Sequence, residues 1–259
     1  MSPWNALLVG FALTCLAFIA VWVRQLRSRN AGMVDPVWSW SMGGLGVLYA
    51  LSASGAPLLR IVVGVVAGLW GLRLGTHLYL RNAGKPEDSR YAKLRAEWGD
   101  QADRRMLQFF IMQAVFALLL SLGMWTVAWQ TEVPGALQLG CALALATASI
   151  LGEALADRQL ERFRSRPENR GKVCRAGLWG WSRHPNYFFE CLHWPCYAIL
   201  AWGTPTGWVA LLPPVIMLWL LLKVSGIPLN EAAAAARRPE YAEYIRTVSS
   251  FVPLPPRRS

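Results

Sequence analysis

The sequence lacks the features of a soluble or disulfide-stabilised protein. Only 16% of its 259 residues are charged, whereas 54% are hydrophobic. It has five cysteines but no Cys-x-x-Cys pair, and four of the five lie inside apolar runs, so we expect neither a disulfide framework nor a metal site. No Gly-x-Gly-x-x-Gly motif follows a strand pattern, which excludes a Rossmann domain. This composition is typical of a protein that lies in an apolar environment.

Long apolar runs dominate what is present. About 20 residues of helix cross a bilayer core of about 30 Å. The first run has no basic segment before it and reaches full spanning length, so we expect no cleavable signal peptide. The sequence therefore predicts an all-α, polytopic membrane protein forming a single domain over residues 1–259. Its seven transmembrane helices, of which the second and sixth are short, are expected at about 5–23, 37–52, 58–80, 107–129, 135–156, 187–202 and 207–224.

The positions of the basic residues predict the orientation of these helices. Of the 26 Lys and Arg, 23 lie in segments 24–36, 81–106, 156–184 and after 225, and the alternate loops contain none. The positive-inside rule then places the N-terminus outside and the C-terminus in the cytoplasm, and we expect a bacterial inner membrane. The net charge of +11 suits a membrane surface first and an anionic cofactor second. Nucleic acid is not an expected partner, because no soluble basic domain is present to hold it.

The most informative stretch is residues 177–193, Gly-Leu-Trp-Gly-Trp-Ser-Arg-His-Pro-Asn-Tyr-Phe-Phe-Glu-Cys-Leu-His. A basic loop leads into an apolar helix on which Asn186, Glu190 and His193 follow i, i+4, i+7 and share one face. A glutamate and a histidine at the mouth of a membrane helix are costly, which indicates a function. The candidate site residues of this stretch are Arg183, His184, Asn186, Tyr187 and Glu190.

The fifth apolar run continues without a helix breaker to Arg164, so its helix should project into the cytoplasm. Glu153, Asp157 and Arg164 lie on one face. Intrahelical ion pairs at the interface are one interpretation, which is weaker for Glu153 because it lies within the apolar run. In the loop that follows, the positive-inside rule alone accounts for the cations, but their density beside a glycine turn also suits a diphosphate. The loop cations proposed for such a ligand are Arg170 and Lys172.

Three residues of the first half also need an explanation. Asp35 precedes Pro36, where a helix cap is the favoured interpretation and a proton-donating or substrate-orienting group is the alternative. Arg73 lies about two turns inside its helix and should face a polar cavity or a carboxylate. His77 is as compatible with a structural role as with a catalytic one.

Two polar segments outside the helices complete the candidates. The mixed-charge loop at 81–95 is expected to be a solvated surface. An alanine-rich short helix is expected after residue 225. Beyond it, Tyr241, Tyr244 and Arg246 are either interfacial belt residues or part of a segment that folds back over the cytoplasmic site.

Two stretches together resemble a known family. Gly-Leu-Trp-Gly-Trp-Ser-Arg-His-Pro-Asn-Tyr-Phe-Phe-Glu, and Ser-Gly-Ile-Pro-Leu with the later Arg-Pro-Glu-Tyr-Ala-Glu-Tyr and Phe-Val-Pro-Leu-Pro-Pro, resemble the bacterial uncharacterised branch of the steroid 5-alpha-reductase-like family. Pro-Glu-Asp-Ser-Arg-Tyr at 86–91 fits the same branch. The resemblance covers most of the chain. It implies a seven-helix membrane fold that binds NADPH on the cytoplasmic side and reduces an activated carbon–carbon double bond of a lipid-like substrate that enters from the bilayer.

The resemblance also implies roles for individual residues. Asn186 and Glu190 match contacts at the nicotinamide end of the cofactor. Asp157 and Arg164 match acidic and basic cofactor-binding positions, and Tyr241 matches a tyrosine near the cofactor.

The chain departs from the family pattern at several positions. Glu153 stands where the steroid reductases have an asparagine, and Asp35 is the best counterpart of their catalytic glutamate. Their catalytic tyrosine has no clear match, since Trp70 aligns there. Asp35 in its protonated form, Arg73 and His77 are therefore the candidates for stabilising negative charge on a substrate carbonyl.

Two other functions stay open. Membrane methyltransferases that act on isoprenylcysteine or phospholipid amines resemble the same Arg-His-Pro and glutamate pattern and bind S-adenosylmethionine, and Asn230-Glu231 is compatible with them. The whole-chain match and the basic cluster at 164–175 favour the reductase, because NADPH carries several negative charges. A non-catalytic lipid-binding protein is the third possibility.

Overall fold

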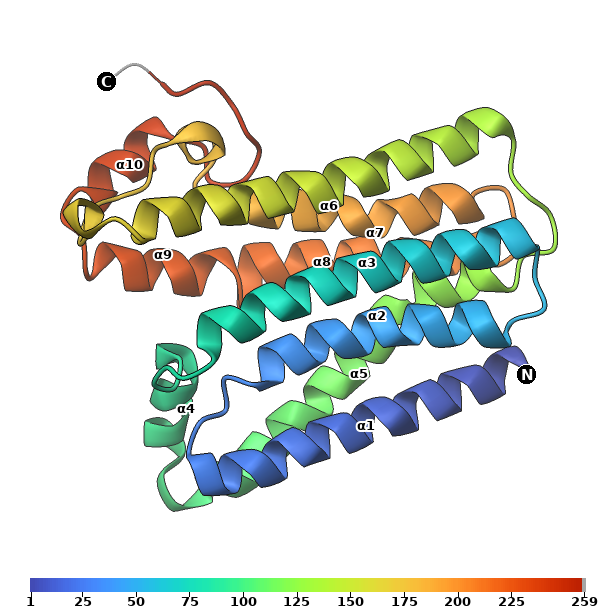
Figure 1. Ribbon diagram of the computed structural model, residues 1–259, viewed down its shortest axis with the longest axis horizontal. Helices are drawn as coiled ribbons and strands as arrows, with labels where there is room; N and C mark the ends of the chain where they lie inside the picture. Colours follow the sequence, from blue (N-terminus) through green and yellow to red (C-terminus); the bar gives the residue numbers. More distant parts are fainter. Residues whose placement is uncertain (258–259) are drawn as a thin grey trace. The chain divides into compact units, whose positions relative to one another are not determined.

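The computed structural model describes residues 1–257, and in that range it consists of helices and connecting loops, with one isolated bridge between Ser182 and Ser249. The chain divides into two compact units (Figure 1). Unit 1 comprises Met1–Pro134 with Gly203–Ala210, and unit 2 comprises Gly135–Trp202 with Leu211–Ser259.

Unit 1 is a helical bundle in which α1, α2 and α3 each pack against α5. Proline at the first position starts α1 and α3, where its missing N–H costs no hydrogen bond. The α2 and α3 backbones approach closely at Gly43 and Gly71, since a Cβ on Gly71 would lie 2.7 Å from the Gly43 Cα. The helices of this unit are α1 (Pro3–Ser28), α2 (Val34–Ser52), α3 (Pro57–Asn82), α4 (Ser89–Trp98) and α5 (Ala102–Ala128).

Unit 2 is organised around two long neighbours, α6 and α7, which run side by side (Figure 1). They approach closely at Gly152, where a Cβ would lie 2.2 Å from the Phe189 ring. α8 packs on α7, and α10 contacts α9. The helices are α6 (Ala136–Arg164), α7 (Pro185–Ala201), α8 (Leu212–Trp219), a π-helical turn (Leu220–Val224), α9 (Ile227–Ala235) and α10 (Tyr241–Thr247).

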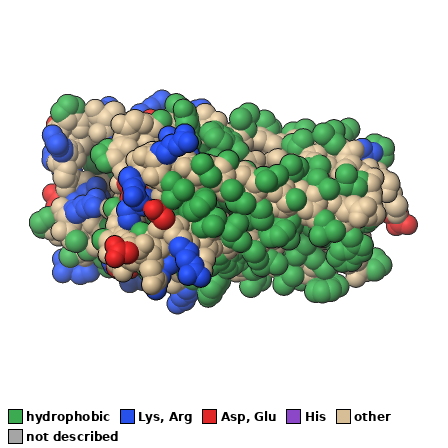
Figure 2. Space-filling view, turned by 90° about the horizontal axis from the view of Figure 1, so that it is seen from below, with side chains coloured by type: hydrophobic (Ala, Val, Ile, Leu, Met, Phe, Trp, Pro, Cys, Tyr) green, Lys and Arg blue, Asp and Glu red, His purple; other side chains and the backbone are tan. Residues whose placement is uncertain are grey.

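Within residues 1–257, five helical segments are long and apolar enough to cross a membrane, so the chain is an integral membrane protein. α2 and α7, which have 19 and 17 residues, are not among the five. They correspond to the two short runs of the sequence, so the seven crossings and their orientation stay predictions. Hydrophobic side chains cover most of the face in Figure 2, and Lys and Arg gather toward one end of it. The five segments are Pro3–Ser28, Pro57–Asn82, Ser89–Ala128, Ala136–Arg164 and Gly207–Ala235.

Local patterns predicted several elements well. α6 continues unbroken to Arg164, and the alanine-rich helix after residue 225 forms as α9. α4 was not predicted from the sequence, because its polar residues are typical of a loop. α4 begins with the Asp88 carboxylate accepting a hydrogen bond from the Arg90 N–H, which satisfies one of the free donors of its first turn.

Candidate functional site

Arg183 is the best-connected residue of the Arg-His-Pro loop in unit 2. Its side chain is only 8% exposed, and its Nε donates to Oε1 of Glu231 at 2.7 Å. Its Nη1 donates to the carbonyls of Ile245 and Val248 at 3.0 and 2.5 Å. The guanidinium is thus neutralised by α9 and held by the backbone around the end of α10. It positions the loop, since Glu231 and these carbonyls accept from its Nε and Nη1 groups.

His184 shares the same carboxylate. Its Nε2 lies 3.2 Å from Oε1 of Glu231, and its ring stacks on Tyr187 with centroids 5.4 Å apart and planes 6° apart. The Tyr187 hydroxyl accepts a hydrogen bond of 2.7 Å from Asn230. The consecutive residues Asn230 and Glu231 therefore fix both the loop and the first turn of α7. From the sequence, Glu231 was considered only as compatible with a methyltransferase, although a lone carboxylate in an alanine-rich helix was a usable signal.

The C-terminal segment folds back onto this loop. The Tyr244 hydroxyl donates to the carbonyl of Trp179 at 2.5 Å. The backbone N–H of Arg183 donates to the carbonyl of Ser249 at 2.8 Å. Ser182 Oγ donates to the carbonyl of Phe251 at 2.7 Å. Of the two interpretations of this segment, folding back is therefore confirmed for Tyr244, which is buried rather than part of an exposed belt.

The two tyrosines of α10 differ from Arg246 in their surroundings. Tyr241 and Tyr244 are both buried, and Arg246 is exposed. Burial, followed by the nearby charge of Glu231, raises the pKa of Tyr241 to about 12. Burial likewise raises the pKa of Tyr244. Both phenols are neutral at ordinary pH and pack as uncharged side chains.

A second group of polar side chains lies between α6 and α7. Asn186 Nδ2 is 3.4 Å from Oδ1 of Asp157, and Glu153, Asp157 and Glu190 are all less than 8% exposed. Glu190 accepts a hydrogen bond of 3.2 Å from the Trp194 indole. Asn186 of α7 and Asp157 of α6 are therefore neighbours. Glu153 and Asp157 are buried side chains, and the interpretation of intrahelical ion pairs stays a prediction.

His193 lies one turn beyond Glu190 on α7. It is fully buried, and its Nε2 is 3.2 Å from the Tyr197 hydroxyl. The face of α7 that the sequence marked by its i, i+4, i+7 spacing is therefore buried and polar.

The cations after α6 are directed toward solvent. Arg164, Arg170 and Lys172 are exposed, around a left-handed Gly171 with φ of 81°. Arg175, which is also exposed, pairs with Glu243 at 3.2 Å and lies over the Tyr244 ring. Three exposed cations beside a glycine turn can bind phosphate groups.

In unit 1, Asp35 does not cap α2. The N-cap is Met33, which makes no side-chain cap bond, so the favoured capping interpretation is wrong. The Tyr91 hydroxyl donates to Oδ1 of Asp35 at 2.5 Å, and Arg90 donates to Oδ2 at 2.9 Å. Both oxygens thus accept from α4, and a proton-donating role of Asp35 stays a prediction.

The loop at 81–95 is not simply a solvated surface. Arg95 pairs with Glu87 at 2.9 Å, with side chains 18% and 11% exposed. Arg90 also pairs with Asp88. Burial alone would raise the pKa of Asp88, but the hydrogen bonds and charge of Arg90 outweigh it and lower the pKa. The predicted solvation holds for Lys93, which is exposed and pairs only loosely with Glu97 at 3.8 Å.

The remaining candidates of unit 1, Arg73 and His77, are half-buried and lie four residues apart on α3. In residues 1–257, no group of three or more His, Cys, Asp or Glu side chains is placed to hold a metal ion.

A family model described as "Protein of unknown function (DUF1295)" matches residues 21–248. No curated protein and no solved structure matches the chain. The matched range includes every candidate residue named above, from Asp35 to Arg246. The chain belongs to DUF1295, a steroid 5-alpha-reductase-like family.

Proposed function

We propose that this protein is a membrane oxidoreductase that transfers a hydride from NADPH to an activated carbon–carbon double bond of a lipid-like substrate, such as a steroid or another enone. The observation that carries the proposal is the contact of Asn186 with Asp157 in a buried polar layer between α6 and α7. Buried acids and amides in a membrane helix pair are costly unless they serve a function. Membership of a steroid 5-alpha-reductase-like family supports the same reaction.

The side chains of unit 2 fit such a cofactor in their chemistry. A dinucleotide phosphate needs cations, and Arg164, Arg170 and Lys172 are exposed after α6. A carboxamide needs both a donor and an acceptor, which Asn186 and Glu190 supply. Of the other predicted contacts, Arg183, His184 and Tyr244 hold the surrounding loop, and we assign them positioning roles.

In the proposed mechanism, bound NADPH supplies the hydride, and the protein supplies orientation and electrostatics. Glu190 orients the carboxamide while Trp194 fixes the glutamate through its indole N–H. Asn186 and Asp157 hold the neighbouring part of the cofactor, and the exposed cations neutralise its phosphates. Arg73 and His77, which belong to unit 1, stay sequence-based candidates for stabilising negative charge on a substrate carbonyl. Asp35 contributes as the anchor of Arg90 and Tyr91.

The proposed topology has seven crossings, with α2 and α7 spanning the bilayer beside the five longer segments, the N-terminus outside and the C-terminus in the cytoplasm. The absence of Lys and Arg from the loops 53–57, 130–134 and 203–206 supports it. In a cysteine-free background, an impermeant thiol reagent should label a cysteine placed in loop 203–206 from outside intact spheroplasts. A cysteine in loop 165–172 should react only after permeabilisation. The reverse pattern would contradict the proposed orientation.

Ligand-induced thermal stabilisation tests the reaction class. A ligand present at 100 times its Kd stabilises the native state by about 2.7 kcal/mol. In mild detergent, NADPH should raise the midpoint of thermal unfolding measured by tryptophan fluorescence, and S-adenosylmethionine should not. Stabilisation by S-adenosylmethionine alone would overturn the proposal. Stabilisation by neither ligand would favour a non-catalytic lipid-binding protein.

One observation favours the methyltransferase as a second candidate. Arg183, His184 and Glu231 lie in one cluster, and the resemblance to the membrane methyltransferases rests on an Arg-His-Pro motif and a C-terminal glutamate. The same ligand experiment separates the two reactions. A Glu231→Gln variant adds a second comparison, because a direct ligand contact would change affinity even in a folded protein.

A further inference from the structure

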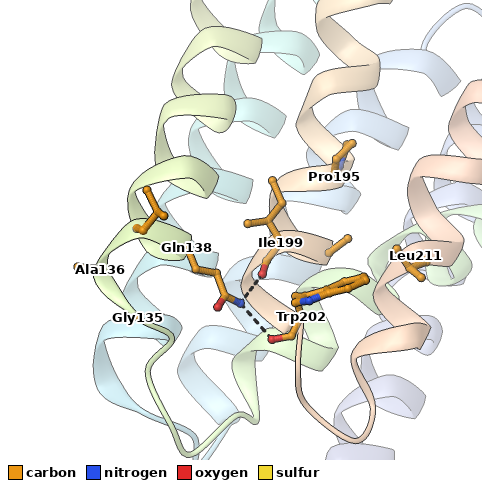
Figure 3. Close-up of a pocket in the computed structure, with 9 residues that line it drawn as sticks. Gly135, Ala136, Gln138, Pro195, Ile199, Trp202 and Leu211 are labelled. Carbon is orange, nitrogen blue, oxygen red and sulfur yellow. Dashed lines mark hydrogen bonds between the residues drawn. The ribbon is translucent and has the colours of Figure 1, made fainter.

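Unit 2 contains an apolar groove that none of the candidate residues lines. It encloses about 730 Å³ between the start of α6, the second half of α7 and the start of α8 (Figure 3). The polar member of its lining is Gln138. The lining residues are Gly135, Ala136, Leu137, Gln138, Pro195, Ala198, Ile199, Trp202 and Leu211.

Small side chains and a proline shape this hollow. At Gly135 an added Cβ would have no atom within 4 Å, which shows that open space adjoins the helix start. Pro195 lies inside α7 and cannot donate to the carbonyl one turn earlier, so it loosens the helix at the groove. The Ala198 methyl fills little of the space left between the helices.

Gln138 fixes the groove without making it polar. Its Nε2 donates to the carbonyls of Ile199 and Trp202 at 2.7 and 3.1 Å, as Figure 3 shows. Both carbonyls lie at the C-terminal end of α7, and that of Ile199 also accepts from the Trp202 N–H at 3.2 Å. The Gln138 amide N–H groups therefore already bond to the protein. A molecule in the groove would contact mainly hydrocarbon side chains.

Segments of the chain that can span a membrane also form part of the groove. Two of the segments that supply its lining, Ala136–Arg164 and Gly207–Ala235, are long and apolar enough to cross a membrane. Leu137 is 82% exposed and Trp202 is 71% exposed, so the groove opens to the outside of the protein. A tryptophan at the end of a membrane helix is typical of the level of the lipid headgroups.

The groove is remote from the basic end of the same unit. α6 has 29 residues, so about 43 Å of helix separates its start from the cations near Arg164. Trp202 follows Asn186 by 16 residues, or about 24 Å along α7. An occupant of the groove therefore lies beyond the layer in which Asn186 and Asp157 meet.

We propose that this groove is a binding site for one alkyl chain of a bilayer phospholipid. Its volume falls within the range of about 300–1,000 Å³ that is usual for small-molecule pockets. A partner protein would need about 800 Å² of contact on each side, which nine lining residues do not offer. The hydrocarbon lining, the opening toward the bilayer and the tryptophan at headgroup level together specify an acyl chain. The inference holds whichever reaction the protein catalyses.

Photocrosslinking in nanodiscs tests the site. The probe is a phosphatidylcholine with a diazirine at the end of one acyl chain, and the labelled residues are mapped by peptide mass spectrometry. The wild-type protein should be labelled preferentially at the groove residues of α7 and at the start of α6. Gly135→Leu should reduce that labelling about tenfold, because its side chain displaces roughly two methylene groups of the bound chain.

Gly140→Leu is the matched control, since Gly140 lies near the start of α6 outside the groove, and a Cβ added there also meets no atom within 4 Å. It should keep wild-type labelling. Ala136→Leu also fills the groove, and it replaces Gly135→Leu as the test variant if Gly135→Leu does not fold. Equal labelling of all lipid-facing helices, or unchanged labelling in the filled variants, would overturn the proposal. Protection of the groove by a second copy of the chain in crosslinked dimers would overturn it as well.

Discussion

The Nε of Arg183 donates to Oε1 of Glu231 at 2.7 Å, although the two residues are 48 positions apart in the sequence. The contact joins α9 to the loop that begins α7. Because the same oxygen lies 3.2 Å from His184 Nε2, one carboxylate fixes two consecutive residues of the Arg-His-Pro motif. The C-terminal helices are therefore part of the architecture of the candidate site.

Replacing Glu231 by alanine should destabilise unit 2 strongly. The change leaves the Arg183 guanidinium, which is 8% exposed, without its carboxylate. Loss of one partner from a fully buried pair costs about 3–5 kcal/mol, and the 20% exposure of Glu231 reduces the expected cost to about 2–3 kcal/mol. Thermal unfolding in detergent, followed by tryptophan fluorescence, measures the effect.

Glu161→Ala is the control for this variant, because Glu161 is an exposed carboxylate on α6. It should change the free energy of unfolding by no more than about 0.5 kcal/mol. Equal effects of the two substitutions would show that the Glu231 contact does not hold the loop.

In unit 1, Asp35→Ala should cost more stability than Tyr91→Phe. The phenylalanine variant removes one hydrogen bond, worth about 1 kcal/mol. The alanine variant leaves the Tyr91 hydroxyl without its acceptor and removes one of the two carboxylates that pair with Arg90, at about 2–3 kcal/mol. Glu97→Ala, which breaks an exposed pair with Lys93, should have almost no effect on the same unfolding measurement. If Asp35→Ala left the stability unchanged, the anchoring role of Asp35 would be contradicted.

Sequence periodicity predicted the contacts that follow from helix geometry. The spacing of Glu153, Asp157 and Arg164 on one helix, and of Asn186 and Glu190 on the next, marked the faces that carry the buried polar layer. Apolar length marked the membrane segments, and the absence of a breaker predicted the continuation of α6 to Arg164.

Contacts between distant segments could not be predicted in this way. Tyr91 and Asp35 are 56 residues apart, and a mixed-charge segment has the same composition whether it is solvated or folded against other helices. The capping interpretation of Asp35 failed for this reason: local position favoured a cap, whereas a tertiary hydrogen bond and ion pair determined the outcome.

The exposed cations after α6 should matter for the proposed cofactor. Arg170→Gln and Lys172→Gln should each weaken NADPH binding about fivefold, because an exposed charge contact contributes about 1 kcal/mol. A cation that contacts the 2′-phosphate should affect NADPH more than NADH. Arg27→Gln, at the exposed end of α1, is the control and should leave both affinities unchanged. Fluorescence titration at two salt concentrations measures the effect, and unchanged affinity in both loop variants would contradict the assignment.

Tyr241 should make stability depend on alkaline pH. Its pKa in the folded state is raised to about 12, above the ordinary value of about 10 for a phenol. A raised pKa gives a contribution to stability that is complete below pH 10 and is lost as the pH rises to about 12. Tyr241→Phe should therefore flatten the decline of the unfolding midpoint in this range and remove one late-titrating group from the phenolate absorbance curve. An unchanged curve would show that Tyr241 titrates as an exposed phenol.

The closest approach of α6 to α7 gives a test of the packing that aligns Asn186 with Asp157. Gly152→Ala places a methyl group 2.2 Å from the Phe189 ring, so the ring or the helix must shift, at a cost of about 1–3 kcal/mol. Gly140→Ala on the same helix meets no atom within 4 Å and should stabilise the helix by about 0.5–1 kcal/mol. The two substitutions have the same chemistry, so opposite signs of their effects on thermal unfolding isolate the packing at Gly152. Effects of the same sign would contradict this helix contact and, with it, the alignment of the polar layer on which the proposed cofactor site depends.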